Sequence, residues 1–246
     1  MITINSHDAV HKFWMYRLLI SIVSSNKLND LYFKGGTCAA MAGFLDRFSV
    51  DLDFDYVGPV EQVSVIKKEL KFIFKELDLE IKDESQKALQ FFLKYPNKNK
   101  DGRNTLKIDI NFPPPKNNNY KPIKLNDISR VVMCQDIETM FANKLVAVID
   151  RFEHNNSIAG RDIYDIYHFF VNNYRYNYKV ITERTGLSLV DFFRKLHSFI
   201  EDNINEKILT QDLNFLLPYD RFKKLRRTLK QDVLIFINLE INNIKK

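Results

Sequence analysis

The first half of the chain alternates between segments with helical spacing of apolar residues and segments with strand spacing. Apolar residues three or four positions apart predict helices over about residues 6–25 and 61–79. Leu31–Phe33 is expected to form a short strand that ends at a Gly-Gly turn, followed by a helix of about ten residues. Residues Val50–Val57 alternate between Asp and apolar side chains, which is the period of a β-strand.

Further strands are expected before residue 135, and helices after it. The pattern predicts strands at Leu89–Tyr95 and Leu106–Phe112, with a polar turn around Asn97–Asn104, and a short strand within Pro122–Val132. The predicted helices of the second half cover about residues 136–153, 160–174, 188–204 and 218–244. This change of pattern predicts an α/β domain over residues 1–135 and a helical-bundle domain over 136–246.

Composition and charge narrow the classes of protein without naming one. The 246 residues carry a net charge of +6, which permits a nucleic-acid partner but does not require one. Cys38 and Cys134 lack metal-ligand spacing, which favours a reduced, intracellular chain. Apolar runs are too short for a membrane span, and a signal peptide is not apparent. We therefore expect a cytoplasmic protein that has no membrane partner.

One constellation indicates chemistry: a strand, Gly35-Gly36-Thr37, a helix, and then Asp51 and Asp53 on the next strand. Glycines at a strand-to-helix turn let the backbone approach a phosphate, and a neighbouring hydroxyl can donate to it. Residues two apart on a strand project from the same face. Paired carboxylates so placed suit Mg²⁺, which binds a few carboxylates together with substrate phosphates. The pattern predicts a metal-dependent site for a phosphate-containing substrate.

Two further aspartates are candidates for a third ligand. Asp55 continues the face of Asp53 but lies about 7 Å further along the strand, so we expect it to face solvent or to support the ligands. Asp109 lies in a β-rich run where a buried carboxylate needs a partner, and is the expected third ligand. Alternating aspartates are more often a solvated face, but like charges on one strand repel one another. That repulsion favours the metal site.

These residues carry a resemblance to a known family. Phe33–Thr37, followed by Arg47–Phe54, resembles the AbiEii/AbiGii-type nucleotidyltransferases, toxins of type IV toxin–antitoxin and phage-abortive systems. The resemblance implies a polymerase-β-like nucleotidyltransferase core with a mixed sheet, followed by a C-terminal helical bundle, in an α/β (α+β) fold. It also implies Mg²⁺ and an NTP substrate.

The resemblance extends into the helical half. Phe141–Ala147 looks like the family's motif of Lys144 with alanine three residues later, and Gly160–Tyr167 looks like its Arg-Asp-x-x-Asp motif with Asp162 and Asp165. Lys144 lies on a helix with almost no polar face and therefore needs an anion, a carboxylate or a nucleotide phosphate. A structural ion pair or a lysine that reaches solvent remains the alternative.

The choice between the two aspartates stays open. Asp162 lies near a helix start, where an acid is favoured in any case. Family members often carry a basic residue where this chain has Ala159, so the geometry of the motif is unsettled. The resemblance implies that Lys144 contacts the nucleotide and that Asp162 or Asp165 positions it or acts as the base.

A basic cluster near the C-terminus is predicted to lie on one helix, where it either tracks an RNA backbone or forms a solvated face. It comprises Arg221, Lys223, Lys224, Arg226, Arg227 and Lys230.

The sequence thus predicts a nucleotidyltransferase with Asp51, Asp53 and Asp109 as metal ligands, and Gly35, Gly36 and Thr37 against the phosphates. Lys144, Asp162 and Asp165 complete the expected catalytic set. The resemblance suggests a tRNA 3′ end or a protein hydroxyl as acceptor, and a cognate antitoxin as partner. Two alternatives remain: a non-catalytic nucleotide- or RNA-binding protein of the same fold, and a nucleotidyltransferase that modifies small-molecule antibiotics.

Overall fold

The chain forms two compact units, which a computed structural model describes for residues 6–85, 88–96, 103–214 and 216–245. The sheet unit consists of Met1–Pro114 and Tyr120–Gln135. The helical unit consists of Pro115–Asn119 and Asp136–Lys246. The main boundary therefore falls between Gln135 and Asp136, while a five-residue loop from the first half of the chain belongs to the helical unit.

A seven-stranded mixed sheet forms the centre of the sheet unit, in the order β3-β4-β5-β2-β1-β7-β6. The pairs β2/β5 and β1/β7 are parallel, and the other neighbours are antiparallel. The strands are β1 (Leu31–Lys34), β2 (Leu52–Tyr56), β3 (Glu80–Glu84), β4 (Leu89–Lys94), β5 (Thr105–Asn111), β6 (Tyr120–Leu125) and β7 (Arg130–Gln135).

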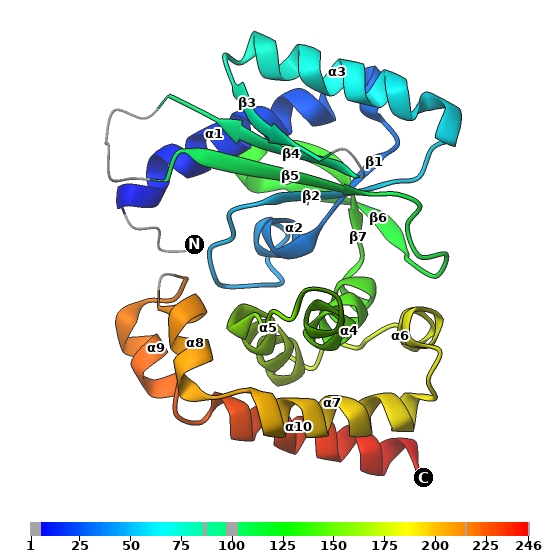
Figure 1. Cartoon of the computed structure of the whole chain (residues 1–246), viewed down its shortest axis with the longest axis vertical. Helices are drawn as coiled ribbons and strands as arrows, with labels where there is room; N and C mark the ends of the chain where they lie inside the picture. The colour runs from blue at the N-terminus through cyan, green and yellow to red at the C-terminus, as the bar shows by residue number, and fades with distance from the viewer. Residues whose placement is uncertain (1–5, 86–87, 97–102, 215, 246) are drawn as a thin grey trace. The chain divides into compact units, whose positions relative to one another are not determined.

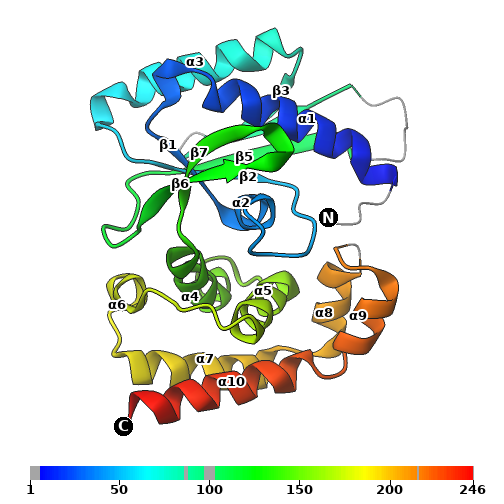
Figure 2. The ribbon, with the colours of Figure 1, turned by 180° about the vertical axis from the view of Figure 1, so that it is seen from behind.

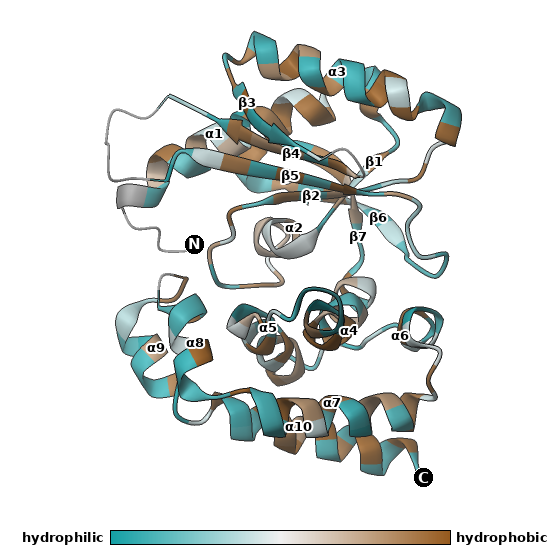
Figure 3. Cartoon of the chain, in the orientation of Figure 1, coloured by the Kyte–Doolittle hydropathy of each residue, from teal (hydrophilic) through white to brown (hydrophobic). Residues whose placement is uncertain are grey.

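The two faces of the central strands differ in character. Phe33, Phe54 and Ile110 are register neighbours across β1, β2 and β5, and all are buried. The alternate positions carry polar side chains, because successive residues of a strand point to opposite faces. Helices α1 (Ser6–Val23) and α3 (Val63–Glu76) lie on one side of the sheet, and α2 (Gly35–Met41) lies on the other (Figures 1 and 2). Hydrophilic and hydrophobic bands alternate along α3 (Figure 3), which buries its apolar side.

The helical unit is built around aromatic contacts between α4 and α5. The ring of Phe141 lies 5.1 Å from Phe169, 4.8 Å from Phe170 and 5.8 Å from Tyr176, measured between centroids. Helices α7 and α10 run side by side in both views (Figures 1 and 2). The helices are α4 (Ile137–Asn155), α5 (Gly160–Val171), α6 (Tyr178–Thr185), α7 (Leu189–Asn203), α8 (Glu206–Leu213), α9 (Tyr219–Leu225) and α10 (Leu229–Ile244).

Several elements differ from the predicted ones. The helix predicted over 218–244 is two helices, α9 and α10, and the strand predicted within Pro122–Val132 is a hairpin of β6 and β7. A turn of 3₁₀ helix at Asn126–Ile128 and a left-handed Ser129 (φ 52°) reverse the chain in that hairpin. Helices α6 and α8 and strand β3 were not predicted. Residues 97–102 of the predicted polar turn lie outside the described residues.

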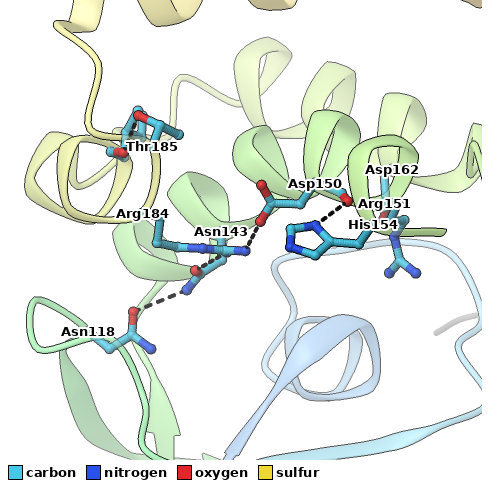
Figure 4. A network of polar contacts seen from close by, with 9 residues as sticks. Asn118, Asn143, Asp150, Arg151, His154, Asp162, Arg184 and Thr185 are labelled. Atoms are coloured by element: carbon cyan, nitrogen blue, oxygen red, sulfur yellow. Dashed lines mark hydrogen bonds and ion pairs between the residues drawn. The ribbon is translucent and has the colours of Figure 1, made fainter. Parts of the chain in front are cut away.

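The loop Pro115–Asn119 is held in the helical unit by side chains of α4 and α6. Glu183 accepts hydrogen bonds from the backbone N–H groups of Lys116 (2.7 Å) and Asn117 (2.8 Å). Beside it, Arg184 donates to Asn143 (2.7 Å) and pairs with Asp150, while Asn143 donates to Asn118 (Figure 4). These contacts satisfy backbone groups that a loop cannot pair by itself.

None of the helices in the described ranges has both the length and the apolar character needed to cross a membrane.

Candidate active site

The turn between β1 and α2 brings the backbone of Gly35 against Asp53. Gly35 has φ +77°, and a Cβ at this position would lie 2.1 Å from Oδ2 of Asp53. Gly36 is nearly as confined, because a Cβ there would lie 2.8 Å from Oγ of Ser49. Only glycine gives both the left-handed conformation and the space at residue 35. The Gly-Gly turn therefore fixes a bare stretch of backbone beside a carboxylate of β2.

Two buried side chains fix the backbone at Asp51. The hydroxyl of Thr37 donates to the carbonyl of Asp51 at 2.5 Å, and Nε2 of His11 donates to the carbonyl of Val50 at 2.8 Å. Both side chains are at most 2% exposed. Thr37, which was expected to donate to a phosphate, has its hydroxyl directed at the chain instead. β2 begins at Leu52, so Asp51 lies immediately before the strand rather than on it.

Asp53 and Asp109 lie side by side on adjacent strands. They are register partners in the parallel pair β2/β5, and Lys34 of β1 is the register partner of Asp53 on the other side. All three therefore project from the same face of the sheet. Oδ2 of Asp109 accepts from Nζ of Lys107 (2.6 Å) and from Nε2 of Gln90 (2.9 Å). The structure thus brings together two of the three predicted ligands.

Charge and burial make this pair of carboxylates receptive to a cation. Burial raises the pKa of Asp53 from 3.8 to about 6, and the negative charges of Asp51 and Asp109 act in the same direction. Lys34 and Lys107 oppose them in part. Across the described ranges, no group of three or more His, Cys, Asp or Glu is arranged to hold a metal ion. Two adjacent carboxylates nevertheless fit Mg²⁺, which takes one or two carboxylates and completes its shell with water and phosphate oxygens.

The raised pKa of Asp53 predicts how Mg²⁺ binding depends on pH. Between about pH 4 and pH 6 the carboxyl group of Asp53 keeps its proton in the folded chain and releases it in the unfolded chain. Without metal, Asp53 therefore lowers the free energy of unfolding as the pH rises through this range. Mg²⁺ requires the carboxylate and acts in the opposite direction. We expect the Mg²⁺-induced rise in Tm to be small at about pH 5 and complete at about pH 8. A rise independent of pH, or one that persists in Asp53→Asn, would contradict this prediction.

Glycine substitution tests the turn, and the chain supplies a matched control. Gly43 has φ +80° but nothing within 4 Å of a Cβ, so Gly43→Ala carries the backbone strain without a clash. Gly43→Ala should lose about 1–2 kcal/mol of stability from the left-handed backbone, and Gly35→Ala should lose more because of the clash with Asp53. Only Gly35→Ala displaces Asp53, so only this variant should lose nucleotidyl transfer and Mg²⁺ binding. Thermal unfolding and labelled-nucleotide transfer measure the two effects, and equal activity in both variants would refute the prediction.

Asp55 does not face solvent, contrary to one of the two expectations. Its side chain is 0% exposed, and Oδ1 accepts from Nζ of Lys34 at 2.6 Å. Oδ2 accepts from the hydroxyl of Tyr120 and from Nε2 of Gln135, both at 2.7 Å, and Asn111 approaches Oδ1 at 3.4 Å. These donors come from β1, β5, β6 and β7. Asp55 is therefore a buried anchor between strands, two residues beyond Asp53.

In the helical unit, Lys144 contacts both candidate aspartates. Its Nζ lies 2.8 Å from Oδ1 of Asp162 and 2.9 Å from Oδ2 of Asp165. Burial would raise the pKa of Asp162, but Lys144 and Arg151 outweigh it and hold that pKa well below its usual range. The anion that Lys144 required is thus supplied by carboxylates of α5. Arg151, which no sequence pattern singled out, lies two helical turns beyond Lys144, on the same side of α4.

The basic cluster near the C-terminus is not a single helical face. Its residues are divided among α9, the following turn and α10. Three of them have partners within the unit: Arg226 pairs with Glu206 (3.1 Å), Lys230 donates to the carbonyl of Glu201 (2.6 Å), and Arg221 lies over the ring of Tyr164 (5.7 Å). These contacts favour a surface stabilised by local pairing, and the cluster carries no argument for RNA binding.

Comparison with known proteins gives the family. The model of the family described as nucleotidyl transferase AbiEii toxin, type IV TA system, matches residues 17–232. JHP933 from Helicobacter pylori has a similar structure, with a TM-score of 0.56 and 19% identity over 99% of this chain and 98% of that chain. A candidate nucleotidyltransferase from H. pylori gives a TM-score of 0.59 and 19% identity over 98% of both chains. No sequence among curated proteins matches the chain.

The two structural similarities establish the fold, and the family match covers most of the chain, including the Gly-Gly turn, the aspartates of β2 and β5, and Lys144. The chain is therefore a nucleotidyltransferase, a member of the AbiEii family of type IV toxin–antitoxin systems.

Proposed function

We propose that the chain transfers a nucleotide from an NTP to an acceptor hydroxyl, with Mg²⁺ held by Asp53 and Asp109 and assisted by Asp51. The observation that carries this proposal is the register pairing of Asp53 with Asp109, with the backbone of Gly35 packed against Asp53. Mg²⁺, when bound, would neutralise the phosphates and stabilise the leaving pyrophosphate. The remaining steps belong to side chains and backbone of the chain itself.

The turn at Gly35-Gly36 gives the phosphates close access to the backbone beside the carboxylates, and His11 and Thr37 keep Asp51 at the start of β2. In the helical unit, Lys144 supplies a cation for the nucleotide. Asp162 is unsuited to be the general base, because a carboxylate with a strongly lowered pKa accepts a proton poorly. Asp162 and Asp165 instead position Lys144, and Asp165 remains the better of the two candidates for a proton acceptor.

The acceptor is proposed to be the 3′ end of tRNA, and the resulting loss of usable tRNA would block growth until an antitoxin intervenes. Membership of a toxin family supports the antitoxin, and the resemblance noted from sequence suggests the acceptor. The identity of the acceptor is therefore the first property to determine by experiment.

The test incubates the protein with each of four α-labelled NTPs, Mg²⁺ and either total tRNA or a mixture of aminoglycosides. Label in tRNA that depends on Asp53 and on Mg²⁺ supports the proposal. Label in aminoglycoside alone would replace it with antibiotic modification. Tight binding of NTP or RNA with no transfer to any acceptor would indicate a binding protein that keeps the fold.

A further inference from the structure

A buried carboxylate in the helical unit holds two cations together. Oδ1 of Asp162 accepts from Nζ of Lys144 at 2.8 Å, and Oδ2 of the same carboxylate accepts from Nε of Arg151 at 2.8 Å. Both cations belong to α4, seven residues apart, so they project from one side of the helix. Because they contact opposite oxygens of a single carboxylate, their charged heads lie on the order of 5–8 Å apart.

Exposure increases from the anions to the cations. The side chains of Asp162 and Asp165 are 1% and 0% exposed, that of Lys144 is 17% exposed, and that of Arg151 is 40% exposed. The carboxylates therefore form the floor of the cluster and the cations form its outer layer. This order leaves the charged ends of Lys144 and Arg151 accessible to a ligand from solvent.

Charge in the cluster favours an anionic ligand. Arg161 also acts on Asp162, so this carboxylate lies in the field of three cations, Lys144, Arg151 and Arg161. A guanidinium presents a planar fork of donors that matches phosphate oxygens, and an ammonium adds a compact point charge. Two such groups a few ångströms apart can contact neighbouring phosphates of one ligand.

We propose that Arg151, together with Lys144, binds the polyphosphate of the nucleotide, and that Asp162 is the positioning residue that keeps the two cations side by side. This inference deepens the proposed function and rests on it for the identity of the nucleotide. It adds Arg151 to the proposed site as a phosphate-binding residue. A nucleic-acid backbone offers the same phosphate chemistry, so the test must separate these two sources.

The first experiment measures binding of sodium tripolyphosphate in EDTA by calorimetry, for wild type and for Arg151→Gln. Arg184→Gln is the matched control: this arginine also pairs with an aspartate of α4, Asp150, but lies outside the Asp162 cluster (Figure 4). We expect Arg151→Gln to weaken binding by roughly 10-fold or more, and Arg184→Gln to leave it unchanged. Equal affinity in all three proteins would overturn the inference.

A second ligand separates the two sources of phosphate. A short oligonucleotide with a 5′-hydroxyl carries backbone phosphates but no polyphosphate. If Arg151→Gln weakens binding of the oligonucleotide and leaves binding of tripolyphosphate unchanged, the cluster binds a nucleic-acid backbone and the polyphosphate assignment is wrong. The expected result is the reverse.

Asp162→Asn distinguishes positioning from simple electrostatics, because the two predict opposite signs. Removal of a negative charge beside a phosphate site should strengthen anion binding if charge alone matters. If Asp162 positions Lys144 and Arg151, the same substitution should weaken tripolyphosphate binding by roughly 10-fold. Should this variant fail to fold, Arg151→Lys replaces it, since it keeps the charge but not the planar fork, and the inference then requires weaker binding.

The inference and the proposed function fail separately. Binding in EDTA requires no transfer, and the exposed control Asp127→Asn, which lies outside the proposed site, should bind tripolyphosphate as wild type does. If no acceptor is ever labelled while Arg151→Gln still loses tripolyphosphate, the proposed function falls and the phosphate site stands. If transfer occurs and Arg151→Gln changes neither the KM for NTP nor the affinity for tripolyphosphate, the phosphate site falls and the function stands.

Discussion

Asp53→Asn should reduce nucleotidyl transfer by roughly 10²–10³-fold or more, while the protein stays folded. Asp53 is the central carboxylate of the site: it pairs in register with Asp109 of β5 and with Lys34 of β1, and it lies against the backbone of Gly35. The amide keeps the shape of the side chain but removes the charge that Mg²⁺ requires. Because burial raises the pKa of Asp53, loss of this charge should not destabilise the metal-free fold.

The measurement is Mg²⁺-dependent incorporation of labelled nucleotide, with thermal unfolding of each variant as the check on folding. Asp127→Asn is the control, since Asp127 is an exposed residue of the same unit whose carboxylate accepts from the hydroxyl of Tyr16. Asp109→Asn should also lose activity, because it removes the neighbouring ligand. Full activity of Asp53→Asn at saturating Mg²⁺ would exclude the carboxylate pair as the metal site.

Asp55→Ala should strongly destabilise the sheet unit, with a loss of about 3–5 kcal/mol. The substitution leaves the ammonium of Lys34, the hydroxyl of Tyr120 and the amide of Gln135 without the carboxylate that now accepts from all three. An unpaired buried charge costs far more than an exposed one. For a chain of this size, the loss corresponds to a fall in Tm of about 10 °C or more.

Denaturant and thermal unfolding of Asp55→Ala, beside the exposed substitution Asp127→Ala, measure this effect. Mg²⁺ should not restore the stability of Asp55→Ala, because Asp55 accepts from Lys34, Tyr120 and Gln135 of the sheet unit. A loss no larger than that of Asp127→Ala would show that the buried network adds nothing to the fold. Asp55→Asn should lie between the two, since its oxygen still accepts while its NH₂ group faces donors.

Local pattern singled out Asp51, Asp53 and Asp109 as candidate ligands, because carboxylates among short apolar runs lack a structural explanation. The structure places Asp53 and Asp109 side by side on β2 and β5, and Asp51 just before β2. Asp55 could not be placed, because its partners Tyr120 and Gln135 are 65 and 80 residues away. That distance hides the network from any argument based on neighbouring residues.

Helices were predicted best where their apolar side is continuous. Four helical segments of the second half were expected, but α6 and α8 have only eight residues each, too short for spacing to stand out from noise. The break between α9 and α10 falls at Arg226–Thr228, where neither glycine nor proline marks it. Arg151 was not singled out from sequence because its partner Asp162 lies on a different helix.

Because the loop Pro115–Asn119 belongs to the helical unit but precedes β6 and β7 in the chain, a single cut cannot separate the two units. Cutting at Gln135 would appear to release a helical fragment, yet that fragment would lack the segment whose amides bind Glu183. Asn177, which donates to the carbonyl of Asn117, would lose its partner as well. Two polypeptides split there should therefore regain a native helical unit only when mixed. The covalent order of the chain makes correct assembly of one half depend on synthesis of the other.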